Sequence, residues 1–182
     1  MKNLLSIILT LSFLTTFSQE TVQKEYYEDG KVKVEYSGKK NEPNGMVKMY
    51  YPSGELQGEL MYNKGIQNGL AKIYYQSGNI QKEMTYNNGV QSDTMKIYYD
   101  NTKLQELSII LNGAKNGVYK LYYETGQIQI DGFTKENQLH GLCIHYNSDG
   151  KKSKEGKYKM GQPVGTWKEY NKVGVTQKNY GQ

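Results

Sequence analysis

A repeat of 24 residues constrains the fold of this chain more than any other feature of its sequence. Each repeat begins with a small or turn-forming residue, and no insertion interrupts the spacing between one start and the next. The starts are Gly45, Gly69, Asp93, Gly117, Gly141 and Gly165, and the tyrosines that follow them are Tyr50, Tyr74, Tyr98, Tyr122, Tyr146 and Tyr170. A fixed period of roughly 20 to 50 residues is typical of proteins that stack one small unit on the next. We therefore expect an elongated array in which each unit contacts only its neighbours.

Each unit is predicted to be a β-hairpin. Segments such as 46–51 and 70–75 are rich in aliphatic and aromatic residues, which favour strands. They end in turn sequences such as Pro52-Ser53-Gly54, in which a type I turn closes with glycine in the left-handed region. A second strand follows, for example 79–86, and a looser loop rich in Gly and Asn leads to the next unit. Beyond the N-terminal segment no stretch shows helical periodicity, so we expect no helix there.

The pattern Gly-x-x-x-x-Tyr-Tyr-x-x-Gly, followed by Tyr-x-x-Gly-x-x-x-Gly, resembles the MORN repeat in its variant form, found in bacterial proteins grouped with the YwqK-like antitoxins. The resemblance implies an all-β fold: an elongated, twisted, single-layer antiparallel sheet of stacked β-hairpins, used in scaffolding, membrane-proximal or protein-binding roles. It departs at Asp93, Thr102 and Ile110, and again at Phe133 and Asn137, where we expect local turn geometry to differ. The array covers 19–182, with units near 21–44, 45–68, 69–92, 93–116, 117–140, 141–164 and 165–182.

Residues 1–18 have the pattern of a secretory signal peptide. Lys2 provides a short basic start, and the apolar run 4–17 is too short to cross a bilayer. Thr16 and Ser18 place the cleavage after Ser18, and no cysteine follows that would carry a lipid anchor. An N-terminal helix that is buried or interfacial is the alternative. We expect an exported protein, periplasmic, envelope-associated or secreted, that is not transmembrane after cleavage.

Composition excludes several classes of protein. One cysteine cannot form a disulfide framework, and a mean hydropathy of -0.80 excludes a polytopic membrane protein. The chain has 23 lysines and no arginine, the side chain best suited to bidentate contacts with bases and phosphates. The net charge of +5 is small and falls by one when Lys2 leaves with the signal peptide. We therefore expect no nucleic-acid partner.

Motifs for catalysis or metal binding are scarce. His140, Cys143 and His145 have ligand types that suit zinc, but the repeat places Cys143 and His145 where another unit has Val47 and Met49. A core or surface substitution is the preferred interpretation, and an enzyme built around Cys143 and His145 is the least favoured alternative. The sequence has no dinucleotide-binding loop, phosphate-binding loop or nucleophile elbow. We expect no enzymatic activity, no cofactor and no metal site.

Alternation along the first strand of each hairpin assigns the recurring residues to two faces of the sheet. Val47, Met49 and Tyr51 represent an aliphatic and aromatic stripe on one face. The other face receives a lysine and, two residues later, a tyrosine. The residues expected to bind a ligand are Tyr50, Tyr74, Tyr98, Tyr122, Lys48, Lys72, Lys96 and Lys120.

Structural roles for the same side chains are the alternatives. The tyrosines would then stack across strands as the core of the array, and the lysines would belong to a solvated face that compensates its own charge. The acids that recur in the second strands, and that could pair with these lysines, are Glu59, Glu83, Asp131 and Glu155.

The function expected from the sequence is a non-enzymatic scaffold for protein-protein interaction in the cell envelope. Toxin neutralisation is the special case that the resemblance implies. The alternative function is binding of envelope polysaccharide or lipid headgroups through the tyrosine and lysine face, since lysine attracts anionic groups and tyrosine supplies flat apolar surface.

Overall fold

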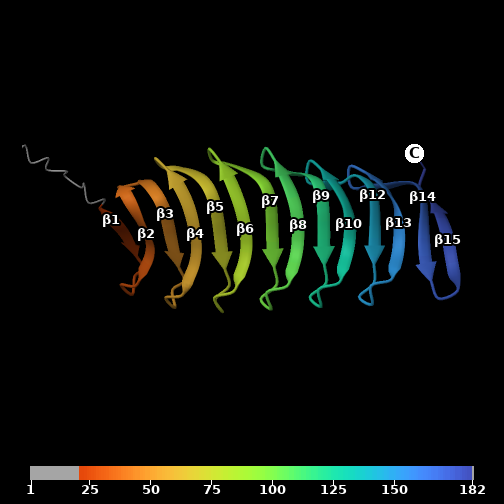
Figure 1. Ribbon diagram of the computed structural model, residues 1–182, viewed down its shortest axis with the longest axis horizontal. Coiled ribbons are helices and arrows are strands. Elements are labelled where there is room, and N and C mark those ends of the chain that lie inside the picture. The colour runs from red at the N-terminus through yellow and green to blue at the C-terminus, as the bar shows by residue number, and fades with distance from the viewer. Residues whose placement is uncertain (1–20, 182) are drawn as a thin grey trace, which may run out of the picture.

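The computed structural model describes residues 21–181, which form one antiparallel sheet of 15 strands and contain no helix (Figure 1). Strands follow one another in chain order, each hydrogen-bonded to the next, except that β11 pairs only with β10 and β12 takes its place beside β10. The strands are β1 (Val22–Tyr26), β2 (Val32–Lys39), β3 (Glu42–Tyr50), β4 (Leu56–Asn63), β5 (Ile66–Tyr74), β6 (Ile80–Asn87), β7 (Val90–Tyr98), β8 (Leu104–Leu111), β9 (Ala114–Tyr122), β10 (Ile128–Lys135), β11 (Gln138–Leu139), β12 (Gly141–Tyr146), β13 (Lys152–Lys159), β14 (Gln162–Asn171) and β15 (Gly174–Asn179). The predicted single-layer sheet of stacked hairpins is thus confirmed. The predicted signal peptide, 1–18, lies outside the described residues.

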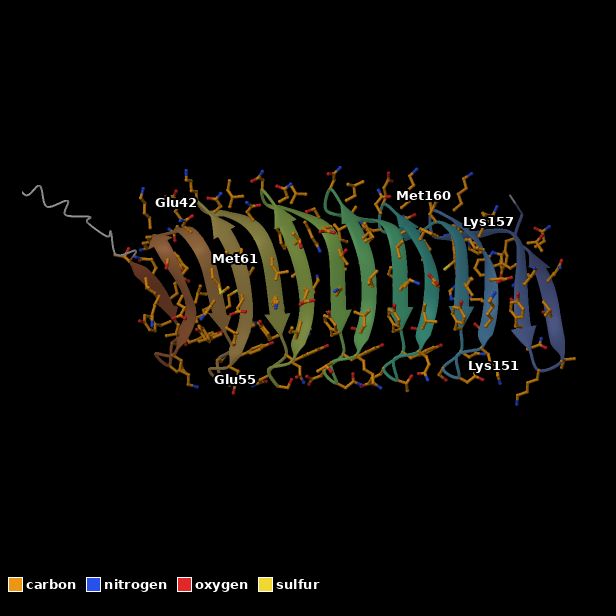
Figure 2. The ribbon with its side chains drawn as sticks, in the orientation of Figure 1. Glu42, Glu55, Met61, Lys151, Lys157 and Met160 are labelled. Atoms are coloured by element: carbon orange, nitrogen blue, oxygen red, sulfur yellow. The ribbon has the colours of Figure 1, made fainter. Side chains whose placement is uncertain are left out.

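The two long edges of the sheet carry different connections. The hairpin turns lie along one edge, where Figure 2 labels Glu55 and Lys151, and the loops that join successive hairpins lie along the other, where it labels Glu42 and Met160. No helix among residues 21–181 is long and apolar enough to cross a membrane. The strands stand side by side along the whole long axis, so a row of equivalent residues extends from one end of the molecule to the other (Figure 1).

The hairpin turns keep the same geometry even where the sequence departs from the pattern. In the regular turns a glycine N–H donates to a carbonyl three residues earlier, as from Gly54 to Tyr51 at 2.9 Å and from Gly78 to Tyr75 at 2.9 Å. Thr102 makes the same bond to the Tyr99 carbonyl at 2.9 Å, with a φ of 67°. The expected change of turn geometry at Thr102 is therefore wrong. The turn is retained, and a β-branched residue adopts a left-handed backbone that normally favours glycine.

The buried side chains all lie on one face of the sheet, which we call the core face. The first strand of each hairpin contributes the residue two positions after the repeat start. The second strand contributes the residue that faces it. Members of the core face include Tyr36, Val47, Ala71, Met84, Met95, Ser108, Ile110, Cys143 and Trp167. The aliphatic and aromatic stripe predicted from Val47 and its equivalents is therefore the core. A single layer can bury these positions because larger side chains of adjacent repeats, such as Leu60, Ile73 and Tyr86, pack against them.

Trp167 is the largest side chain of the core face, and glycine makes room for it. The Trp167 indole is 2% exposed, and it lies over Gly156 on the neighbouring strand. A Cβ atom at Gly156 would overlap the indole ring, so no larger residue fits without displacing the tryptophan. Gly132 likewise leaves space for Cys143, whose Sγ would lie only 2.7 Å from a Cβ atom added at Gly132. Glycines in the second strands thus alternate in space with the bulkier residues of the first strands.

Candidate functional site

The opposite face of the sheet, which we call the ladder face, carries an alternating row of lysines and acids across its middle. Each member of this charge ladder stands directly opposite the next one on the neighbouring strand, with two apolar breaks. In spatial order the charge ladder is Lys24, Glu35, Lys48, Glu59, Lys72, Glu83, Lys96, Leu107, Lys120, Asp131, Ile144, Glu155 and Lys168. Opposite charges facing each other across strands stabilise a sheet by roughly 0.2–1 kcal/mol per pair.

The ladder forms ion pairs both within hairpins and between adjacent hairpins. The ammonium of Lys120 lies 3.1 Å from a carboxylate oxygen of Asp131, and that of Lys168 lies 3.7 Å from Glu155. Lys72 and Glu83 are further apart, at 3.9 Å. All these side chains are partly exposed, so each pair contributes little to stability. The lysines predicted to bind a ligand therefore face acids of the same chain, and their charge is largely compensated.

The predicted tyrosines lie beside the ladder and bond to its acids. Each tyrosine hydroxyl donates a hydrogen bond to the ladder carboxylate on the preceding strand. The pairs are Tyr50 with Glu35 at 2.6 Å, Tyr74 with Glu59 at 2.8 Å, Tyr98 with Glu83 at 2.9 Å and Tyr170 with Glu155 at 2.7 Å. Tyr122 is an exception, because Leu107 occupies the position of the acid, and Tyr146 makes no such bond to Asp131. We call Tyr50, Tyr74, Tyr98, Tyr122, Tyr146 and Tyr170 the tyrosine row.

These contacts change the ionisation of both partners. Burial, with the hydrogen bond to Glu35 as a second cause, raises the pKa of Tyr50 to about 12. Burial and the bonds to their glutamates raise the pKa of Tyr74 and of Tyr98 to about 12 in the same way. The hydrogen bond from Tyr50 holds the pKa of Glu35 below its ordinary value. Tyr50, Tyr74 and Tyr98 are therefore neutral hydrogen-bond donors to the acids of the charge ladder.

A third row on the ladder face is apolar, and its side chains are exposed or half-buried. Its side chains flank the charge ladder on the side away from the tyrosine row. Both strands contribute in the hairpins β3–β4 and β9–β10, whereas Thr85, Thr94 and Lys157 stand opposite Leu70, Ile109 and Leu142. We call Met46, Met61, Leu70, Ile109, Val118, Phe133 and Leu142 the apolar row. Phe133 and Leu142 are each 52% exposed, and Leu70 is 46% exposed. Figure 2 labels Met61 on the sheet between its two long edges. Contiguous exposed apolar surface marks interaction sites in soluble proteins.

Sequence reasoning did not single out the apolar row, although a signal was present. Met46, Leu70, Val118 and Leu142 each follow a repeat start by one residue, and alternation places them on the same face as the lysines. Phe133 carries a second signal. It stands one position before the place of Tyr62, Tyr86 and Tyr158, and a shift of one residue in a strand moves a side chain to the opposite face.

The second tyrosine of each pair has a structural role in joining repeats. Its hydroxyl donates to the backbone carbonyl at the end of the next first strand, 23 residues later. These bonds run from Tyr27, Tyr51, Tyr75, Tyr99 and Tyr123 to Tyr50, Tyr74, Tyr98, Tyr122 and Tyr146, at 2.6–2.8 Å. Each bond satisfies a carbonyl at the strand end and fixes the spacing of two adjacent hairpins.

Cys143 and His145 lie on the core face near the C-terminal end of the array. Cys143 is 1% exposed, and burial raises the pKa of its thiol to about 11. Burial, with the charge of Lys154, lowers the pKa of His145 to about 4, and its Nε2 lies 3.3 Å from the Tyr158 hydroxyl. His140 lies apart, before β12, and its Nδ1 is 3.5 Å from the backbone nitrogen of Met160. A buried neutral thiol is a poor nucleophile, and Cys143 has the core position that the repeat predicts.

One polar cluster interrupts the core face at β8 and β9, and sequence reasoning missed it. Glu106 is only 8% exposed, and its Oε1 lies 2.5 Å from the Lys115 ammonium and 3.0 Å from the Ser108 hydroxyl that donates to it. The Lys115 ammonium also lies 5.2 Å from the centre of the Tyr119 ring. Burial, together with the charge of Glu106, raises the pKa of Tyr119 to about 12. The cluster is satisfied within the chain and offers no free polar group.

Comparison with protein-family models identifies the MORN repeat variant in five segments of the chain, 19–40, 43–64, 67–88, 115–136 and 139–160. No curated protein matches the chain. The segment between the third and fourth matches contains Asp93, Thr102 and Ile110, the residues at which the pattern departs, yet it forms the hairpin of β7 and β8 like the others.

Proposed function

Because the chain belongs to the MORN repeat variant family, whose repeats serve binding and scaffolding, we propose that it is a non-enzymatic scaffold exported to the cell envelope, where its ladder face holds another protein. The observation that carries this proposal is the exposed apolar row beside the charge ladder. Phe133 and Leu142 are half exposed on a single layer that has nothing to cover them among residues 21–181. Apolar surface rimmed by charge is typical of protein interfaces.

The balance of the charge ladder favours a protein over an anionic glycan or lipid surface. Lys72 and Lys120 each face an acid at the neighbouring strand, so the ladder has little net positive field. A protein surface with its own alternating charges and apolar groups matches such a row better than a uniformly anionic polymer does. A toxin is the partner that the resemblance implies, and an exported chain would meet it outside the cytoplasm.

A pull-down from solubilised envelope extract tests the proposal. The immobilised chain is compared with a variant in which Lys48, Lys72, Lys96 and Lys120 are changed to Gln. The control changes four exposed lysines in loops or at a strand end, Lys40, Lys64, Lys135 and Lys172, to Gln. Both variants lose the same charge, and circular dichroism checks that both keep the sheet.

We expect a discrete protein to be retained by the wild type and the loop control and released by the ladder variant. Retention of glycan or lipid without protein would support the alternative function. Equal retention by all three forms would contradict binding through the ladder face. N-terminal sequencing of the cell-associated protein tests export, and a mature N-terminus at Gln19 is the expected result.

A further inference from the structure

We propose that a second copy of this chain docks on the ladder face, with the two sheets face to face and related by a two-fold axis that runs parallel to the strands between β9 and β10. This inference rests on the proposed function in one respect, since both require the ladder face to bind protein. It names the occupant of the C-terminal part of that face.

The axis determines which strands meet. A two-fold rotation about a line parallel to the strands reverses the order of strands and keeps each residue at its position along the strand. In the pair of sheets β9 therefore faces β10, β8 faces β12, β7 faces β13 and β6 faces β14, an order that can be followed in Figure 1. Each row of the ladder face then lies against the same row of the other copy.

Under this rotation the charge ladder is complementary to itself. Across the interface Lys120 faces Asp131, and the break at Leu107 faces the break at Ile144. On the next two strands Lys96 faces Glu155, and Glu83 faces Lys168. Every charge of the charge ladder on these eight strands meets an opposite charge, and the two apolar breaks meet each other. Complementarity of this kind fixes register and excludes wrong partners more than it adds affinity.

The breaks select this axis from the alternatives. In an alternating ladder any axis that falls between two strands matches lysines to acids, and any axis that falls on a strand places like charges together. Only the axis between β9 and β10 brings Leu107 against Ile144, because these two residues are equidistant from it. At the other positions between strands each break either faces a charged or polar group, which would be desolvated without a partner, or lies outside a shorter overlap.

The apolar row independently favours the same axis. Val118 and Phe133 are opposite each other within the hairpin of β9 and β10, so the rotation places Val118 against Phe133 twice at the centre of the interface. On the next strands Ile109 faces Leu142. The most exposed members of the row, Phe133 and Leu142, thus become central and buried. An apolar cluster at the centre of the contact is typical of stable interfaces.

The available surface is large enough for a stable dimer. Ten strands overlap, β5–β10 and β12–β15. At about 4.8 Å per strand and about 20 Å of strand length they offer roughly 1,000 Å² per copy, compared with about 800 Å² per partner in a standard interface. Because both sheets twist, contact is closest at the central strands and opens toward the ends.

The first test compares the apolar row at two places. Sedimentation velocity of the purified protein over a range of concentrations is expected to give twice the monomer mass. Val118→Ser with Phe133→Ser is expected to weaken the dimer by about 100-fold or more. Met46→Ser with Met61→Ser changes the equivalent residues of an earlier hairpin, β3 and β4, outside the overlap, and is expected to leave the dimer unchanged. A wild type that stays monomeric up to about 100 µM, or two variants that behave alike, would overturn the inference.

The second test uses the symmetry of the ladder. Lys120→Glu and Asp131→Lys are each expected to weaken the homodimer by about 10- to 100-fold, because each places two pairs of like charges at the axis. Mixing the two variants restores opposite charges at both contacts, so a heterodimer of near wild-type affinity is expected from the mixture alone. Loss of stability of the monomer cannot produce that recovery. A mixture that remains monomeric, while the wild type dimerises, would exclude this axis.

The two proposals fail separately. A monomeric wild type that still retains an envelope protein through Lys48 and its equivalents would overturn the self-docking and leave the proposed function standing. A protein that dimerises but retains no envelope protein would overturn the proposed function and leave the self-docking standing.

Discussion

Tyr98 and Tyr122 occupy the same position in adjacent repeats but face different residues on the preceding strand. The Tyr98 hydroxyl donates to Glu83 at 2.9 Å, whereas Leu107 stands where Tyr122 would find an acid. Tyr98→Phe removes a charge-assisted hydrogen bond at a partly exposed site, and we expect it to lower the free energy of unfolding by about 1 kcal/mol. Tyr122→Phe is the matched control, with an expected change near zero. Urea denaturation of both variants measures the difference, and equal losses would show that the Glu83 contact is unimportant.

His145 is expected to make the stability of the fold depend on pH in the mildly acidic range. Burial lowers its pKa from 6.5 to about 4, so between these values the unfolded chain binds a proton that the folded chain does not. The contribution of neutral His145 is complete above pH 6.5 and is lost as the pH falls toward 4. We expect the free energy of unfolding to decrease over that range, and His145→Gln to flatten the decrease.

Glu35 also titrates in acid, but the hydrogen bond from Tyr50 holds its pKa below the ordinary value. The stability that ionised Glu35 contributes is therefore lost at a lower pH than the stability that neutral His145 contributes. Denaturation curves at several pH values, for wild type and His145→Gln, separate the two effects. Identical pH profiles would contradict a role for His145.

At the scale of the hairpin, Thr102 provides a test of turn strain. Its φ of 67° lies in the left-handed region, while the regular turns have glycine at this position, such as Gly78 and Gly126. We expect Thr102→Gly to raise the free energy of unfolding by about 0.5–1 kcal/mol, because relief of backbone strain exceeds the added entropy of the unfolded chain. The control is Thr125→Gly in the next turn, which relieves no left-handed strain and is expected to destabilise. Chemical denaturation measures the free energy of unfolding of both variants. A decrease in both would show that the turn at Thr102 is not strained.

The hairpins, their period and the core face were all predictable from the sequence, because they follow from local patterns: alternation, turn glycines and a repeat without insertions. The hydrogen bonds of the ladder face were not predictable from the sequence. Whether Tyr50 reaches Glu35 depends on the register of β2 against β3, in which Glu35 lies opposite Lys48, and that register belongs to the pair of strands and not to either strand alone. The pair of buried Glu106 and half-buried Lys115 was missed for a similar reason, since neither residue departs from the sequence pattern and the two meet only across β8 and β9.

At the scale of the whole molecule the repeat makes the chain modular. Each hairpin contacts only its neighbours, so stability is close to a sum of repeat and interface contributions. Residues 69–92 are one complete period, and Met95, Lys96 and Ile97 would replace Ala71, Lys72 and Ile73 beside β4 if that period were removed. The charge ladder and the core face then continue without a change of phase, and the Tyr51 hydroxyl finds the carbonyl of Tyr98 in place of that of Tyr74.

Deletion of 69–92 should therefore give a shorter folded sheet. We expect the same circular dichroism per residue, cooperative unfolding at lower denaturant concentration, and a retained dimer, since the deleted strands β5 and β6 lie far from the axis between β9 and β10. Deletion of 69–80 removes half a period, so a second strand would follow β4 with its polarity and core residues out of phase, and this control is expected to unfold or aggregate. If both deletion variants lose the sheet, the array folds only as a whole, and contacts between adjacent hairpins are not sufficient to fold it.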